Sequence, residues 1–461
     1  MRIKSKITLC LAACVAALSS CLDIKSHLEE DPYNPNRPGG PATAPRTFFI
    51  YMGGDNSLNG SLQGNIAQLM AGTTREVLRG GRVLVYYTPL MTYNTPSSTD
   101  LPFTTPQLLE IFPNPVTNKG IYRVLKSYDK QSSASPQVLK QVLDDVFSYA
   151  PSESYCIDFS SHGTGWLPAA RTTGTTAPAA PAAHVAASPV AADTPADSSA
   201  GTGAAPVTMY SFTNEGRPGY SFEMNIDELA AALPDNKFDF IMFDACLMGG
   251  VEVAYQLRDK SPYVVASVAE ILSKGFPYDK FLAHIFTGGQ PDLQGMCDEY
   301  IKDYQSDPAV ISIYNTANLP ALAAATRGVV DKYGAQLLSL PVTVSSYPGN
   351  PVQYYYSYGM PPTALDMGDA MNALLQNRDP ALLASWQQAL SGVVVYARAT
   401  DYAISKKYLF GSSSDPFLYT RYSGITMHIP SVAYNTITAS STWNPFFYNH
   451  TQWGKDVFPQ P

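Results

Sequence analysis

A thiol and an imidazole end two separate apolar runs in this chain of 461 residues. Cys246 ends FDFIMFDAC, and His162 ends the earlier run YCIDFSSH. A cysteine thiolate can attack a carbonyl carbon, and a histidine beside it can move the proton that the attack requires. The pair therefore predicts a Cys-His dyad, the chemistry of a cysteine peptidase. One point stays open, since His162 either helps to deprotonate Cys246 or protonates the leaving amine.

Residues next to this pair fit the same chemistry. Gly163 has no side chain, so its N–H can approach a substrate oxygen and form an oxyanion hole with the N–H of Cys246. Asp244 lies two residues before Cys246 and points to the same side of the strand. Its carboxylate is expected to bind a cationic substrate side chain, the alternative being a structural acid that holds loop amides. Asp55 and Asn56, in a GGDN turn, are expected to support the site.

The elements that must position these groups are apolar strands separated by helix-length segments. Near-continuous apolar runs predict strands at 48–52, 82–88, 155–162, 238–246 and 263–270. Such runs are typical of parallel strands buried on both faces. The alternation predicts an α/β fold, a mostly parallel central sheet with helices on both faces. Functional groups gather at the carboxyl ends of parallel strands, where His162 and Cys246 fall.

The N-terminus reads as a lipoprotein leader. Basic residues at positions 2, 4 and 6 precede ITLCLAACVAALSS, an apolar run too short to span a bilayer. Leu18–Cys21 resembles the bacterial lipobox, which predicts cleavage before Cys21 and its acylation. The mature protein is then exported and held by lipid in the bacterial cell envelope, at the outer membrane or cell surface. The alternatives are an ordinary signal peptide or a weaker box at Leu11–Cys14.

The rest of the chain divides by composition. Residues 22–45 are rich in Pro and Gly and predict a flexible tether after the leader at 1–21. Residues 46–280 form the predicted catalytic core. Within it, 167–207 consists mainly of Ala, Pro, Thr and Ser and cannot bury enough apolar surface to fold. Residues 281–461 are expected to form an α/β part packed on that core.

Charge and cysteine content limit the partners. The net charge is −8 with no basic run, which argues against nucleic acid as a partner. Beyond the leader only Cys156 and Cys297 accompany Cys246, so a disulfide framework is not expected. No cofactor is predicted, and no Asp-rich loop has the spacing of a calcium motif. Protein or peptide substrates and a membrane, reached through the lipid, are the expected partners; no oligomeric state follows.

Four blocks, in order, resemble the clostripain family of cysteine peptidases, relatives of gingipains and caspases. They are YMGGDNSL, SSHGTGW, FDACLMGGVEVAYQL and YVVASVAEILSKGFPY, and they lie between residues 46 and 280. The resemblance implies a caspase-like α/β sandwich and a Cys246-His162 dyad. It also implies endopeptidase cleavage after Arg or Lys, with Asp244 in the first specificity pocket.

Two further points follow from the resemblance. Relatives are often matured by cleavage at a basic residue near the site, which makes Arg171 and Arg217 candidate processing positions. Val268 and Ala269 stand where relatives commonly carry acidic residues, so the pocket is expected to differ from theirs. Whether calcium is needed, as in some relatives, stays open.

The alternative of another class is a catalytically silent, caspase-like surface lipoprotein that acts as a binding module. The presence of Cys246, His162, Gly163 and Asp244 together favours the peptidase, because a binding module has no physical need for all four.

Overall fold

The computed structural model describes the predicted core and most of the C-terminal part. The described residues are 34, 40–90, 104–169, 212–217, 220–340, 352–356, 363–401, 419–436 and 441–459. The leader with Cys21, most of the tether and most of the predicted insertion, including Arg171, lie outside them. None of the described helices is long and apolar enough to cross a bilayer.

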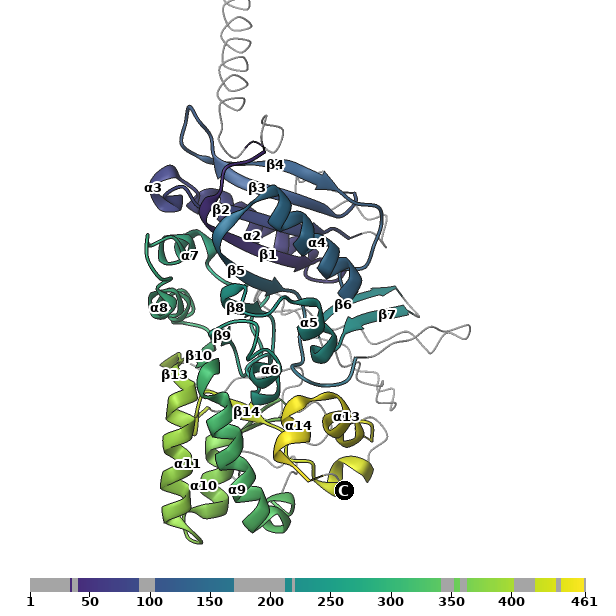
Figure 1. Ribbon diagram of the computed structural model, residues 1–461, viewed down its shortest axis with the longest axis vertical. Helices are drawn as coiled ribbons and strands as arrows, with labels where there is room; N and C mark the ends of the chain where they lie inside the picture. The colour runs from purple at the N-terminus through teal and green to yellow at the C-terminus, as the bar shows by residue number, and fades with distance from the viewer. Residues whose placement is uncertain are drawn as a thin grey trace, which may run out of the picture.

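A single nine-stranded sheet organises the described residues (Figure 1). Its order is β13 (Val394–Ala399), β10 (Val310–Asn315), β9 (Tyr263–Ala266), β8 (Phe238–Asp244), β5 (Ser152–Ser160), β1 (Ala44–Gly53), β2 (Arg82–Thr88), β3 (Gln107–Pro113) and β4 (Gly120–Ser127). The five central strands, from β9 to β2, are parallel to one another. The two strands at each edge pair antiparallel.

The sheet is buried on both faces because helices cover each side. In β1, Phe48, Ile50 and Met52 join one apolar layer, whereas Phe49 and Tyr51 join the other. The first layer includes α2 (Asn59–Gly72), α3 (Arg75–Leu78), α7 (Tyr278–Ile285) and α8 (Leu293–Asp303). The second includes α4 (Pro136–Tyr149), α5 (Ile226–Ala232) and α6 (Val251–Gln256). The predicted α/β sandwich with a mostly parallel core is therefore confirmed.

The C-terminal part extends the same sheet. It contributes β10 and β13, so hydrogen bonding crosses the boundary expected at residue 280. Its other elements are α9 (Leu319–Leu338), α10 (Met367–Leu375), α11 (Pro380–Val393), α13 (Trp443–His450), α14 (Gln452–Val457), β11 (Tyr354–Tyr356), β12 (Thr363–Asp366) and β14 (Thr426–Met427). In Figure 1 these helices gather at the end of the sheet beyond β9. The C-terminal part and the core therefore share one sheet.

Some local predictions were wrong. The strand β13 was not predicted: α11 ends at Val393, and the β-branched residues that follow pair with the edge of β10. The hairpin of β3 and β4 was not predicted, since Glu110 breaks its apolar pattern. That carboxylate is buried and pairs with Arg82 at 2.8 Å and Arg123 at 2.6 Å. Leu167, placed at the start of the insertion, is 2% exposed and belongs to the core.

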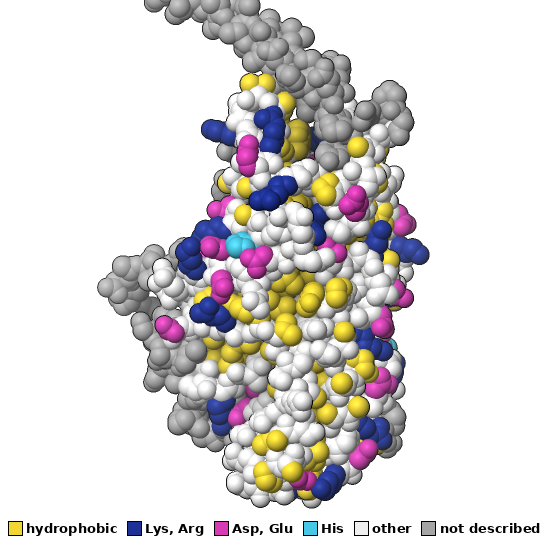
Figure 2. Space-filling model, turned by 60° about the vertical axis from the view of Figure 1, so that its left-hand side comes forward, with side chains coloured by type: hydrophobic (Ala, Val, Ile, Leu, Met, Phe, Trp, Pro, Cys, Tyr) yellow, Lys and Arg dark blue, Asp and Glu magenta, His cyan; other side chains and the backbone are white. Residues whose placement is uncertain are grey.

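The surface shows no large area of one charge on the face drawn in Figure 2, where side chains of Lys and Arg alternate with those of Asp and Glu. This distribution agrees with the absence of a basic run in the sequence.

Candidate active site

The two predicted catalytic residues follow neighbouring strands. β5 and β8 pair in parallel, with Ser160 opposite Asp244. His162 and Cys246 each lie two residues beyond that pair, so both stand at the same carboxyl edge of the sheet. A Cβ on Gly163 would lie 2.8 Å from the carbonyl oxygen of Cys246. The segment after β5 thus touches the segment after β8, and only glycine fits at the contact.

The thiol of Cys246 is held by the backbone of Ile271. The Ile271 N–H donates to Sγ at 3.3 Å, and the thiol faces the Ile271 carbonyl oxygen at 3.7 Å. Leu247, the next residue, has φ of +62°, a left-handed conformation that turns the chain sharply after the thiol. Its N–H donates to the carbonyl of Ala269 at 3.0 Å. Residues 269–271 therefore run directly beside the nucleophile.

Glu270 places a second ionisable group beside the thiol. Its Oε2 is buried and, within the described residues, has no hydrogen-bond partner. Burial raises the pKa of Glu270 to about 8. Burial raises the pKa of Cys246 well above its usual range, and the ionised form of Glu270 raises it further, which favours the protonated thiol. Glu270 was missed from sequence because acidic residues were sought at positions 268 and 269.

His162 contacts the turn after β1. Its Nε2 lies 3.0 Å from Oγ of Ser57. Asn56 fixes this turn, because its amide donates to the Gly53 carbonyl at 2.9 Å and to Ser161 Oγ at 3.2 Å. Asn56 therefore ties the turn to Ser161, the residue before His162. A residue that supports the site is expected to make a contact of this kind.

Asp55, the other supporting residue that we predicted, is 5% exposed in the same turn. Its side chain is thus packed inside the turn, whereas Asn56 bonds Ser161, the residue before His162.

Asp244 turns its carboxylate inward, toward α7. The residue is 7% exposed. Its Oδ2 accepts from Ser160 Oγ at 3.4 Å, from the Phe276 N–H at 3.2 Å and from Tyr278 Oη at 2.9 Å. Burial raises its pKa to about 6. The contact with the Phe276 amide is the one expected of a structural acid, so a substrate side chain reaches this carboxylate only if the loop ending at Phe276 moves.

A second buried acid, Asp158, lies behind Asp244. Its Oδ1 accepts the N–H of Asp244 at 3.1 Å, and its Oδ2 lies 2.5 Å from Tyr278 Oη. Sequence analysis missed it because a single acid inside YCIDFSSH was counted as part of an apolar strand.

Arg217, one of the two candidate processing positions, lies at the end of β6 (Phe212–Arg217). It pairs with Tyr220 of β7 (Tyr220–Met224) in a hairpin. A peptide bond in a paired strand must leave the hairpin before a peptidase can bind it. Arg171 lies outside the described residues.

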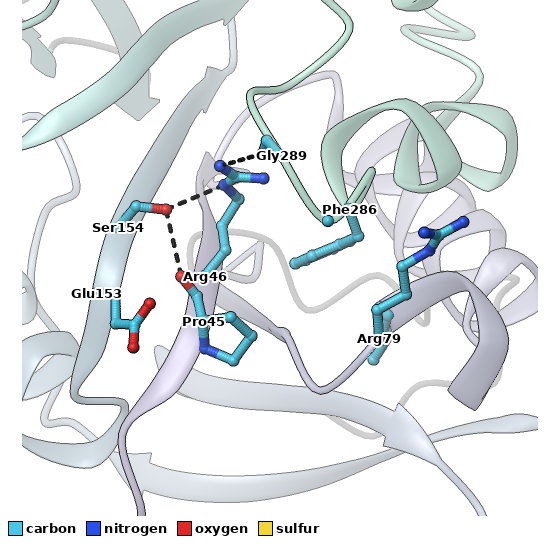
Figure 3. Close-up of a pocket in the computed structure, with 9 residues that line it drawn as sticks. Pro45, Arg46, Arg79, Glu153, Ser154, Phe286 and Gly289 are labelled. Carbon is cyan, nitrogen blue, oxygen red and sulfur yellow. Dashed lines mark hydrogen bonds between the residues drawn. The ribbon is translucent and has the colours of Figure 1, made fainter.

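A pocket at the opposite, amino end of β1 and β5 contains none of the predicted site residues (Figure 3). Arg46 lies in it and binds Asp239 at 3.0 Å and the Gly289 carbonyl at 2.9 Å. Its guanidinium ties β1 to β8 and to the loop after α7, a structural role.

The described residues contain no group of three or more His, Cys, Asp or Glu side chains arranged to hold a metal ion. The calcium requirement left open by the sequence therefore gains no candidate ligand set from this part of the chain.

Comparison with known proteins adds to this geometry. The model of the clostripain family matches residues 219–456, more than half of the chain. The chain belongs to the clostripain family. The four blocks of the predicted resemblance lie between residues 46 and 280, whereas the family match includes Cys246 and runs through the C-terminal part, which contributes β10 and β13 to the sheet.

Individual relatives agree with this assignment. Clostripain from Hathewaya histolytica is 38% identical over 79 residues, and this match spans 16% of the chain and only 15% of clostripain. An inactive zymogen C11 protease from Parabacteroides distasonis is 27% identical, with a TM-score of 0.66 over 91% of this chain and 99% of that one. A secreted C11 cysteine protease from Bacteroides thetaiotaomicron, 21% identical, gives 0.64 over 90% and 100%. The family and the caspase-like fold were both predicted and are confirmed.

Proposed function

We propose that this clostripain-family chain is a cysteine endopeptidase in which Cys246 and His162 form the catalytic dyad. The observation that carries the proposal is their position after the paired strands β8 and β5, with Gly163 against the Cys246 carbonyl. Cys246 Sγ attacks the scissile carbonyl carbon, and the N–H groups of Gly163 and Cys246 stabilise the oxyanion. His162 takes the thiol proton and returns it to the leaving amine, and water then hydrolyses the thioester.

In this proposal the described conformation is inactive, because it cannot yet bind a substrate. The thiol is protonated and held by Ile271, and Asp244 is covered by the segment that ends at Phe276. Substrate binding requires residues 270–276 to shift. The similarity to a relative described as an inactive zymogen supports this proposal. The activating cleavage in this proposal lies at Arg171 or Arg217, in the chain between the strands that carry His162 and Cys246.

Cleavage after Arg or Lys is the proposed specificity. Asp244 and Glu270 bring two carboxyl groups to the region beside Cys246, and the ionised form of either attracts a cationic side chain. Glu270, in its ionised form, supplies the negative charge that the side chains of Val268 and Ala269 lack. A related C11 protease from Bacteroides thetaiotaomicron was crystallised with an irreversible peptide inhibitor, which supports peptides as the substrate class.

Export and lipid anchoring at Cys21 complete the proposal. The lipobox carries the anchor, and the tether at 22–45 would hold the sheet away from the membrane by several nanometres when extended. The description of a related C11 protease as secreted supports export.

Hydrolysis of fluorogenic peptides that end in Arg, Lys, Asp or Leu tests the proposal. Wild type and Cys246→Ala are compared before and after limited cleavage between residues 170 and 211. We expect turnover of the Arg and Lys peptides by wild type only, and more of it after cleavage. An absence of turnover by both intact and cleaved protein would favour the binding module instead.

The same pair of proteins tests self-processing. If Cys246→Ala is nicked at the same bond and rate as wild type, another peptidase makes the cut.

A further inference from the structure

Two buried carboxyl groups share one tyrosine hydroxyl behind the candidate site. Tyr278 Oη lies 2.5 Å from Oδ2 of Asp158 and 2.9 Å from Oδ2 of Asp244. Asp158 and Tyr278 are both fully buried. No ion pair among the described residues involves either acid, so no cation offsets their charges.

The number of protons decides how these three groups bond. A tyrosine hydroxyl carries one proton and donates one hydrogen bond. If both acids were ionised, one of the two contacts would bring lone pairs together next to two uncompensated negative charges in the protein interior, which is strongly unfavourable. A second proton removes the conflict, because one carboxyl group then donates to Tyr278 Oη while the tyrosine donates to the other.

The surroundings decide which acid holds that proton. Asp244 Oδ2 accepts from Ser160 Oγ and the Phe276 N–H in addition to Tyr278, and three donors favour an anion. Asp158 Oδ2 has Tyr278 Oη as its contact, at the shorter distance, while its Oδ1 accepts the N–H of Asp244. Asp158 also lies deeper, since it is 0% exposed and Asp244 is 7% exposed.

We propose that Asp158 is held as a neutral carboxylic acid that donates to Tyr278, which in turn donates to Asp244 and keeps that residue as the single carboxylate of the pair. Asp158 and Tyr278 are then positioning residues for Asp244, and they set the charge and the direction of the group offered to a cationic substrate side chain. The part that concerns the substrate rests on the proposed function, whereas the protonation of Asp158 does not.

Asp158→Asn in the full chain tests the proposal, because an asparagine copies a protonated aspartate. Its Nδ2 donates to Tyr278 Oη and its Oδ1 still accepts the Asp244 N–H. We expect the melting temperature to stay within a few degrees of wild type. The KM for an Arg peptide at pH 7 should stay within about twofold of wild type. Asp158→Leu, of similar size but without a donor, is expected to raise that KM about tenfold or to lower the melting temperature clearly. A loss in Asp158→Asn as large as in Asp158→Leu would overturn the proposal.

Infrared spectroscopy supplies a test that needs no peptidase activity. The difference spectrum of wild type minus Asp158→Asn at pH 7 is expected to contain the carbonyl stretch of one protonated carboxylic acid that shifts in D2O. A difference spectrum with only the two carboxylate bands would show that Asp158 is ionised and would overturn the proposal. If no peptide is hydrolysed while the carboxylic acid band is present, the proposed function fails and the protonation stands.

Discussion

The hydroxyl oxygen of Ser57 lies 3.0 Å from Nε2 of His162. An imidazole has two nitrogens, and a hydrogen bond at one of them fixes the tautomer and the direction of the other. We expect the proton transfer proposed between His162 and Cys246 to depend on the ring orientation that this contact sets. The turn that carries Ser57 is also bonded to Ser161, the residue before His162, by the Asn56 amide.

Replacing Ser57 with alanine tests this orientation. We expect kcat of the Ser57→Ala protein on an Arg peptide to fall about tenfold, with KM little changed, because general acid–base catalysis contributes about 100-fold or more and only the orientation is lost. The acidic limb of the pH profile should move, since it reports the histidine. Ser57→Thr keeps the hydroxyl and should retain most activity. An unchanged kcat and pH profile in Ser57→Ala would remove Ser57 from the site.

Alkylation of the three cysteines beyond the leader checks the state of the thiol. Cys156 and Cys297 are fully buried and Cys246 is partly exposed, so iodoacetamide should label Cys246 first. Because burial and Glu270 raise the pKa of Cys246 above its usual range, labelling at pH 7 should be slow and should rise about tenfold per pH unit. Mass spectrometry locates the label. Fast labelling that does not change between pH 6 and 8 would show a resting thiolate.

Glu270→Gln should change both stability and pH dependence. Burial raises the pKa of Glu270 from 4.5 to about 8, so the folded state binds a proton that the unfolded state has released between these values. The free energy of unfolding of wild type therefore falls as pH rises from about 4.5 to about 8. The variant lacks this loss, so its melting temperature should match wild type at pH 4 and exceed it at pH 9.

Glu270 should also affect substrate affinity. The KM of wild type for an Arg peptide should fall as pH rises through 8, because the carboxyl group becomes an anion, and Glu270→Gln should not show this fall. A Leu peptide is the control, since its KM should be equal in the two proteins. Equal KM profiles for the Arg peptide would place Glu270 outside the binding site.

Gly275→Ala should destabilise the loop over Asp244. Gly275 has φ of +66°, and a Cβ there would lie 2.6 Å from Asp244 Oδ2. We expect a loss of about 1–3 kcal/mol in the free energy of unfolding, measured by urea denaturation. Gly328→Ala is the matched control, because it lies inside α9 with nothing within 4 Å of the added Cβ. It should gain about 0.5–1 kcal/mol. A neutral Gly275→Ala would mean that the loop already moves freely.

The sequence was sufficient to predict the parts of this protein that repeat a regular pattern. The five central strands are apolar on both faces, so β1, β2, β5, β8 and β9 were all predicted, and their carboxyl ends brought His162 and Cys246 to one edge. The resemblance of four short blocks was sufficient for the family. The outer strands β3, β4 and β13 were missed or misread, because strands near the edge of a sheet mix polar and apolar residues and their partners are set by tertiary pairing.

The contacts around the dyad could not be predicted for a different reason. Ser57, Glu270 and Ile271 meet the predicted catalytic residues only because the segments after four strands, β1, β5, β8 and β9, converge, and no local pattern encodes that convergence. Asp158 could not be recognised either, because a single acid inside an apolar strand carries no signal of its own. Its role depends on Tyr278, which lies beside it only in the folded chain.

The pairing of β5 with β8 has a consequence for the chain as a polymer. Residues 170–211 lie between these strands in the sequence, and a cut among them would leave His162 on one polypeptide and Cys246 on the other. The two would stay together, because β5 and β8 pair from Tyr155 opposite Phe238 to Ser160 opposite Asp244 and share both apolar layers. The mature protein would then be a heterodimer whose catalytic centre neither polypeptide holds alone, and two separately expressed halves should reconstitute it when mixed.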